Sequence, residues 1–123
     1  MPRAIIAIIL LGFALGAPAR AAEDSKPYDG QLLRLAELLG AVHYLREICG
    51  AGDGSLWRDK MEALVEAEGT SALRRAKLVQ SFNKGYRSYR RTYQTCTKSA
   101  ETAVSRFLAE GADIAEAVSA GGS

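Results

Sequence analysis

One stretch, residues 79–96, constrains the fold of this chain more than any other part of its sequence. Its large apolar residues are three or four positions apart, a spacing that places side chains on one side of an α-helix: Val79, Phe82, Tyr86, Tyr89, Tyr93 and Cys96. Another side of the same helix carries a basic residue every seven positions, at Lys77, Lys84, Arg91 and Lys98. The pattern predicts a helix with an aromatic inner face and a cationic outer face.

The predicted outer face has charges of a single sign. The chain has eight basic residues and no acidic one between Gly69 and Ala100, and Arg74, Arg87 and Arg90 flank the regular line. A solvated helix face usually mixes charges of both signs. The sequence therefore leaves two interpretations open: a surface that binds an anionic partner, or a solvated face that acids on neighbouring helices partly match.

The first 21 residues are predicted to be a secretory signal peptide. Arg3 supplies a positive start, an apolar run covers 4–17, and the small-x-small sequence at 19–21 is a cleavage site. The run is short for a membrane span, and no later segment is apolar enough for one. The alternative is an uncleaved N-terminal anchor. Cleavage after Ala21 predicts a periplasmic protein without a transmembrane span, and export argues against a nucleic-acid partner.

Removal of the signal changes the charge balance. The chain has 16 basic and 14 acidic residues, and Arg3 and Arg20 lie in the signal, so the remainder has 16 − 2 = 14 basic and 14 acidic residues. Cys49 and Cys96 both remain. An even pair of cysteines in an oxidising compartment usually forms a disulfide.

Turn and cap residues divide the remaining chain into four predicted helices. Residues 22–28 form a predicted flexible lead-in, the helical domain covers 29–118, and 119–123 form a disordered tail. The predicted helices cover 31–49, 56–68, 72–95 and 98–118. Asp29, Asp53 or Ser55, Thr70 or Ser71, and Thr97 are the candidate N-caps. Gly85 permits a kink in the third helix, but the seam continues in phase, so we expect continuity.

Short connections between four helices predict an all-α, up-down-up-down bundle. In that arrangement the first and third helices end at the same end of the bundle. Cys49 and Cys96 lie at those two helix ends, so one disulfide can staple the domain without exchange between chains. The alternative, a free reactive thiol, is disfavoured because His43 is poorly placed to activate Cys49.

Three segments resemble a known family: YDGQLLRLAELLGAVHYLREICG, a tryptophan segment opening WRDKM, and LVQSFNKGYRSYRRTYQTC. The chain is similar, from Tyr28 to about Ile114, to short exported alphaproteobacterial proteins known only as a domain of unknown function. The resemblance implies a periplasmic location, a helical fold and a Cys49–Cys96 pair. It implies no activity. Lys98 departs from the proline expected there in relatives, which affects only the last turn.

Candidates for chemistry are few. His43 and Glu47 lie one turn apart, but two ligands are too few for a usual metal site, and a locally hydrogen-bonded histidine is the favoured interpretation. Tyr86, Tyr89 and Tyr93 could line a groove for a sugar or peptide, although their seam spacing favours core positions. Asp53 and Asp59 give only a weak glycosidase signal. We predict no catalytic residue, no metal and no cofactor.

The sequence as a whole predicts a non-catalytic periplasmic binding or accessory protein. It would dock an acidic envelope component or a periplasmic protein through a basic, Tyr-edged helix. The candidate binding residues are Lys77, Lys84, Arg87, Arg90, Arg91, Lys98, Tyr86, Tyr89 and Tyr93. The alternatives are a small peptidoglycan hydrolase that uses carboxylates, and a purely structural or oligomer-forming module.

Overall fold

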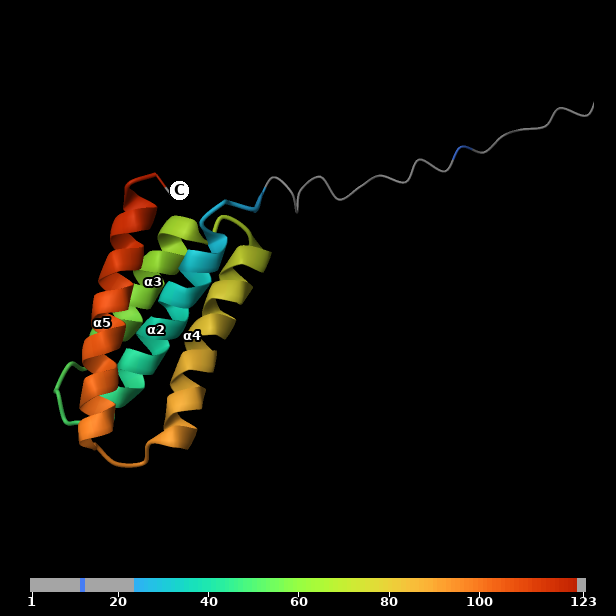
Figure 1. Cartoon of the computed structure of the whole chain (residues 1–123). Coiled ribbons are helices and arrows are strands. Elements are labelled where there is room, and N and C mark those ends of the chain that lie inside the picture. The colour runs from blue at the N-terminus through green and yellow to red at the C-terminus, as the bar shows by residue number, and fades with distance from the viewer. Residues whose placement is uncertain (1–11, 13–23, 122–123) are drawn as a thin grey trace, which may run out of the picture.

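The computed structural model describes residue 12 and residues 24–121 as four helices without a strand: α2 (Asp29–Ile48), α3 (Leu56–Glu68), α4 (Ala72–Thr92) and α5 (Lys98–Ser119). The helices alternate in direction, with α2 in the middle and α5 and α4 on either side of it in this view (Figure 1). The prediction of an all-α, up-down-up-down bundle is confirmed. Residues 1–11, 13–23 and 122–123, which include the predicted signal peptide apart from residue 12, lie outside the described part.

Helix α2 is the hub of the fold, because it packs against each of the other three helices and most extensively against α4. One cluster of buried residues joins Leu32 and Ala36 of α2 to Met61 and Leu78. A second cluster, nearer the disulfide, joins Tyr44 and Leu45 of α2 to Ala100 and Val104 of α5, with Tyr86 and Tyr89 against it. A helix surrounded on three sides needs a wide apolar face, which the leucines of this segment supply.

Two glycines bring α2 and α4 into backbone contact. A Cβ atom on Gly40 would lie 1.9 Å from the carbonyl oxygen of Phe82, and one on Gly85 would lie 2.0 Å from that of Glu37. Each glycine thus leaves room for the other helix. The continuous helix expected through Gly85 is confirmed. A glycine in the middle of a helix costs about 1 kcal/mol relative to alanine, and here it allows the two helices to pack closely.

Two of the four helices start with a predicted side-chain cap. Ser71 accepts a hydrogen bond from the backbone N–H of Arg74, and Thr97 accepts one from that of Ala100. Ser55 precedes α3 as predicted, but its side chain donates to Asp59 rather than capping the backbone. Asp29 lies in the first turn of α2 and not at its N-cap, which is Tyr28.

Helix α4 ends three residues earlier than predicted, at Thr92. Tyr93 has an extended backbone, and its carbonyl accepts a hydrogen bond from the hydroxyl of Tyr44. The chain then turns so that Cys96 bonds to Cys49, with their Cα atoms 4.8 Å apart. The predicted disulfide is present, but Cys96 is an exposed loop residue and not part of the helical seam.

Three large apolar residues are more exposed than the apolar spacing of their helices suggests. Val79 is 44% exposed and Leu108 is 38% exposed, while Trp57 is half-buried. All three lie at the margins of the helix contacts, because α2 alone is surrounded and the outer helices have one side free. Apolar spacing identified the correct side of each helix but overestimated the width of its buried part.

The segments that flank the bundle show two further features. Asp24, in the predicted lead-in, accepts hydrogen bonds from Thr70 and from Arg74. Ser119, predicted to begin the tail, is the last residue of α5.

Within the described residues, none of the helices combines the length and apolarity that crossing a membrane requires.

Candidate binding surface

The outer side of α4 carries three exposed cations within two turns, Lys84, Arg87 and Arg91, which we call the cationic patch. They line a shallow depression together with Gln80 and Asn83. The spacing of three and four residues places them on one side of the helix. Gly85 faces the opposite way, toward α2, so the packing of α4 directs these cations outward.

The cationic patch has no acidic partner among residues 24–121, since none of its three side chains forms an ion pair there. The ion pairs that do occur use other cations: Arg34 with Glu37 and Glu110, Arg46 with Asp53, and Arg74 with Asp29 and Glu68. Like charges four residues apart, such as Arg87 and Arg91, destabilise a helix by a few tenths of a kcal/mol. The patch is therefore a surface that an anion would stabilise.

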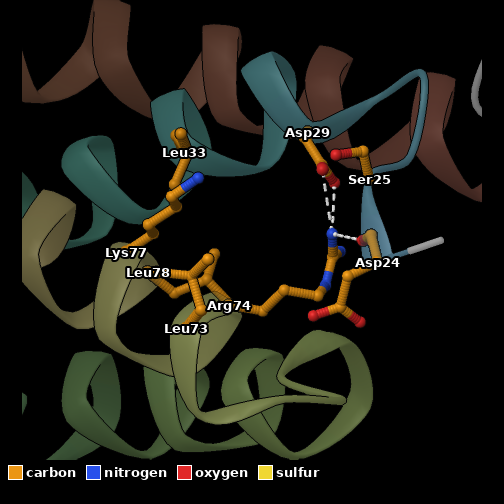
Figure 2. A pocket seen from close by; sticks show the side chains of 8 residues that line it. All are labelled: Asp24, Ser25, Asp29, Leu33, Leu73, Arg74, Lys77 and Leu78. Carbon is orange, nitrogen blue, oxygen red and sulfur yellow. Dashed lines mark hydrogen bonds and ion pairs between the residues drawn. The ribbon is translucent and has the colours of Figure 1, made fainter. Parts of the chain in front are cut away.

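Arg74 is not part of this surface, although the sequence placed it beside the basic line. It is only 8% exposed. Its guanidinium contacts both carboxylate oxygens of Asp29, at 2.7 and 2.9 Å, and the carbonyl of Asp24, at 2.7 Å (Figure 2). It also donates to the carbonyl of Glu68 at 2.8 Å. These partners come from three segments, so Arg74 ties the start of α2 to the α3–α4 turn.

Lys77 lies between the two environments. It is exposed, but it lines the same depression as Arg74, Asp29 and Leu33 rather than the one beside Arg87 (Figure 2). The pKa of Asp29 is lowered: partial burial would raise it, but the backbone N–H of Lys26, the guanidinium of Arg74 and the charge of Lys77 outweigh that effect. Asp29 therefore balances part of the positive charge of Lys77.

Two further predicted binding residues are displaced from the cationic patch. Lys98 is the first residue of α5 and does not continue the line on α4, because α4 ends at Thr92. Arg90 is exposed and lies over the ring of Tyr86, with 5.9 Å from its guanidinium carbon to the ring centroid. Such a cation–π contact turns Arg90 toward the aromatic side of α4.

The three tyrosines of α4 and its C-cap pack against the disulfide-end cluster and are half-buried. Tyr86 contacts Tyr44 edge-on, and Tyr89 contacts Phe107 edge-on and stacks parallel to Tyr93. Burial is the main reason that the pKa values of Tyr86 and Tyr89 are raised. These three rings therefore pack as part of the core. Within residues 24–121, Tyr86 is the only one of the three whose hydroxyl forms a hydrogen bond, to Glu47 at 3.3 Å.

His43 lines a second polar depression, at the disulfide end, with Glu47, Asp53 and Trp57. Partial burial lowers its pKa, so the imidazole is mostly neutral near pH 7. Asp53 accepts hydrogen bonds from Arg46 and from the indole N–H of Trp57, which lower its pKa to about 2. Over residues 24–121 no three His, Cys, Asp or Glu side chains gather as metal ligands.

Sequence reasoning missed two parts of the candidate surface. Gln80 and Asn83 complete the depression beside the cationic patch, and neither was singled out because neutral polar residues on a helix have no spacing signal of their own. Gln80 lies four residues before Lys84 and Asn83 lies four residues before Arg87, and this spacing is the signal that could have found them.

A family model described as a protein of unknown function (DUF2385) matches residues 27–121. No curated protein and no solved structure matches the chain.

Proposed function

The chain belongs to the DUF2385 family, whose function is unknown, and we propose that it is a non-catalytic binding or accessory protein of the periplasm. It docks an acidic envelope component or an acidic protein partner through the outer side of α4. One observation supports this most: the cationic patch is exposed, has one sign of charge and has no acidic partner within residues 24–121. A solvated surface usually mixes charges.

The residues that line the depression favour specific recognition of an anionic group rather than attraction by charge alone. Arg87 and Arg91 each carry a planar fork of donors that matches a carboxylate or a phosphate. Gln80 and Asn83 add neutral donors and acceptors beside them. An acidic surface that places two anionic groups about one helical turn apart would engage both arginines.

The tyrosines have a different part in this proposal from the binding role predicted for them, and one that agrees with the core positions that their seam spacing favours. Their rings pack inside the bundle, so we assign them to holding α4 in place rather than to stacking on a ligand. The hydrolase alternative stays a hypothesis. One of its two candidate carboxyls, Asp53, has a pKa of about 2 and is thus ionised where a general acid must be protonated.

The test is capture of envelope fractions by the purified chain with its disulfide intact. Arg87→Glu with Arg91→Glu should lower the bound amount at least tenfold while the thermal unfolding midpoint stays within a few degrees. A matched control reverses two exposed arginines elsewhere, Arg58→Glu with Arg106→Glu, which changes the net charge equally. Binding that survives the first pair, or that both pairs abolish equally, contradicts a site on α4.

Salt dependence gives a second measurement. Binding through exposed charges should weaken steeply between low and physiological ionic strength, because the Debye length falls to about 8 Å there. Capture that is insensitive to salt would contradict the cationic patch as the main contact.

A further inference from the structure

An apolar groove lies between α3 and α5, on the side of α2 that α4 does not cover. Its floor is formed by Leu35, Leu38, Leu39 and Val42 of α2. These positions span seven residues, or about 10 Å of helix. The groove shares no lining residue with the cationic patch and is independent of the function proposed above.

The α5 wall of the groove is made of small and exposed residues. Ala112 and Ala115 line it and are exposed, and Leu108 stands at its rim with 38% of its surface exposed. Small side chains keep the floor open, and Gly111 approaches Leu35 only at ordinary contact distance, 3.6 Å from an added Cβ. The opening therefore results from side-chain size and not from strained packing.

The α3 wall supplies the one charged group among the described lining residues, Lys60. Its ammonium lies 6.0 Å from the ring centroid of Trp57, which also lines the groove. Lys60 is exposed and forms no ion pair within residues 24–121. An apolar groove with one cation that has no ion-pair partner is complementary to a ligand that has a hydrocarbon part and a single anionic group.

The volume of the groove limits what can fill it. The groove has about 300 Å³ of open space, whereas a helix segment 10 Å long and 10 Å wide occupies roughly 800 Å³. Toward the C-terminus of α5, Val118 packs against the cluster that contains Met61 of α3, which limits the length of the groove. A single extended hydrocarbon chain can therefore lie inside the groove, whereas a helix of a partner or of a second copy could place only side chains in it.

We propose that this groove binds a medium-chain fatty acid, with its hydrocarbon chain over Leu35 to Val42 and its carboxylate at Lys60. A single ammonium matches a monoanion, whereas a phosphate usually draws several donors or a guanidinium fork. Trp57 covers the chain next to the head.

The chain contains one tryptophan, so the emission of Trp57 reports directly on the groove. Titration with hexanoate, octanoate and decanoate should give saturable changes in emission. The affinity should rise roughly fourfold for each added methylene until the groove is full, which follows from about 0.8 kcal/mol per buried methylene. No saturable change below the micelle concentration of decanoate would overturn the proposal.

Two variants separate the contribution of the fatty acid's carboxylate to binding from that of its hydrocarbon chain. Lys60→Gln should weaken decanoate about tenfold and leave decanol unchanged, because only the acid uses the ammonium. Ala112→Phe should abolish both, because its ring fills the groove from the α5 wall. The matched control is Ala109→Phe, at an exposed position of α5 that does not line the groove, and it should bind like the unaltered chain.

Sedimentation of the ligand-free chain distinguishes a protein occupant. A dimer that Ala112→Phe dissociates and Ala109→Phe preserves would show that a second copy fills the groove and would overturn the fatty-acid site. Equal decanoate affinity in Ala112→Phe and the unaltered chain would overturn it as well.

Discussion

The two ends of the bundle are fastened by different chemistry. At the disulfide end, Cys49 is bonded to Cys96 beside a cluster of aromatic rings from α2, α4 and α5. At the opposite end, which we call the arginine end, the buried side chain of Arg74 joins the start of α2 to the α3–α4 turn. Both ends have an apolar cluster, and a covalent bond does at one end what a charged side chain and its acceptors do at the other.

The difference determines which conditions act on each end. A disulfide stabilises mainly by restricting the unfolded chain, and its contribution depends on redox conditions. A buried guanidinium stabilises only while its acceptors stay in place and its carboxylate partners stay ionised. A reductant therefore acts on one end alone. The four predictions below run from the largest expected effect to the smallest: the first three test that separation, and the fourth tests an ion pair at the disulfide end.

Removal of the disulfide should have the largest effect. Cys49→Ala with Cys96→Ala opens a loop with a sequence separation of 47 residues, which the chain-entropy model values at about 4 kcal/mol. Urea unfolding of the variant and of the oxidised chain measures the difference. Hydrogen exchange should then show faster opening at Tyr93 than at Arg74. Equal acceleration at both ends would contradict independent fastening.

A methyl group between α2 and α4 should have the next largest effect. In Gly85→Ala the new Cβ would lie 2.0 Å from the carbonyl oxygen of Glu37, a backbone atom that cannot move alone. We expect about 3 kcal/mol of destabilisation, a clash of about 4 kcal/mol less about 1 kcal/mol of helix propensity. Because this contact lies between the two ends, it should weaken both.

Gly30→Ala is the matched control for that variant, because a Cβ at Gly30 would have nothing within 4 Å. Thermal unfolding of the two variants side by side is the measurement. A Gly85→Ala variant as stable as Gly30→Ala would show that the two helices can separate at little cost.

Replacement of Arg74 should have the third largest effect on stability. Arg74→Met keeps much of the apolar stem but leaves the carboxylates of Asp29 and Glu68 without their partner. Those side chains are 34% and 24% exposed, so water solvates them in part, and we expect about 2 kcal/mol rather than the 3–5 kcal/mol of a fully buried pair.

The neighbouring variant Arg75→Met tests whether the loss is specific. Arg75 is exposed, and within residues 24–121 its side chain donates only to the carbonyl of Gly69, so its replacement should cost under about 1 kcal/mol. Chemical denaturation compares the two. Equal losses would show that Arg74 acts as ordinary surface charge and that the arginine end has no special fastening.

The smallest effect concerns acid. The pKa of Asp53 is lowered from 3.8 to about 2 by Arg46 and Trp57, so its contribution to stability is present above pH 3.8 and is lost as the pH falls through about 2. Asp53→Asn should make the unfolding free energy less dependent on pH between about pH 4 and 2. The slope should fall by an amount that corresponds to the uptake of at most one proton on unfolding. Urea titrations at several pH values measure this slope, and an unchanged slope would contradict the Arg46–Asp53 pair.

The sequence predicted local structure well and long-range partners poorly. The limits of α3 and the caps Ser71 and Thr97 could be predicted because they depend on residues within one turn. The burial of Arg74 could not, because Asp29, its partner, is 45 residues away and no spacing rule connects them. The early end of α4 also depends on a distant contact, the hydrogen bond from Tyr44.

The candidate sites show the same division. Lys84, Arg87 and Arg91 were predicted because a cationic line on one helix can be seen in the sequence. The groove between α3 and α5 was missed, since its floor, its walls and Lys60 come from three helices, and only their packing brings them together. The close contact of Gly40 with α4 likewise depends on how two helices pack.

The position of the disulfide has a mechanical consequence. Cys49 follows the last residue of α2, and Cys96 precedes the first residue of α5, so α3 and α4 lie inside the covalent loop while α2 and α5 lie outside it. A force applied to the two chain ends therefore extends only the outer segments. The enclosed residues, 47 positions from one cysteine to the other, add no length. The oxidised chain would stretch about 160 Å less than the reduced one.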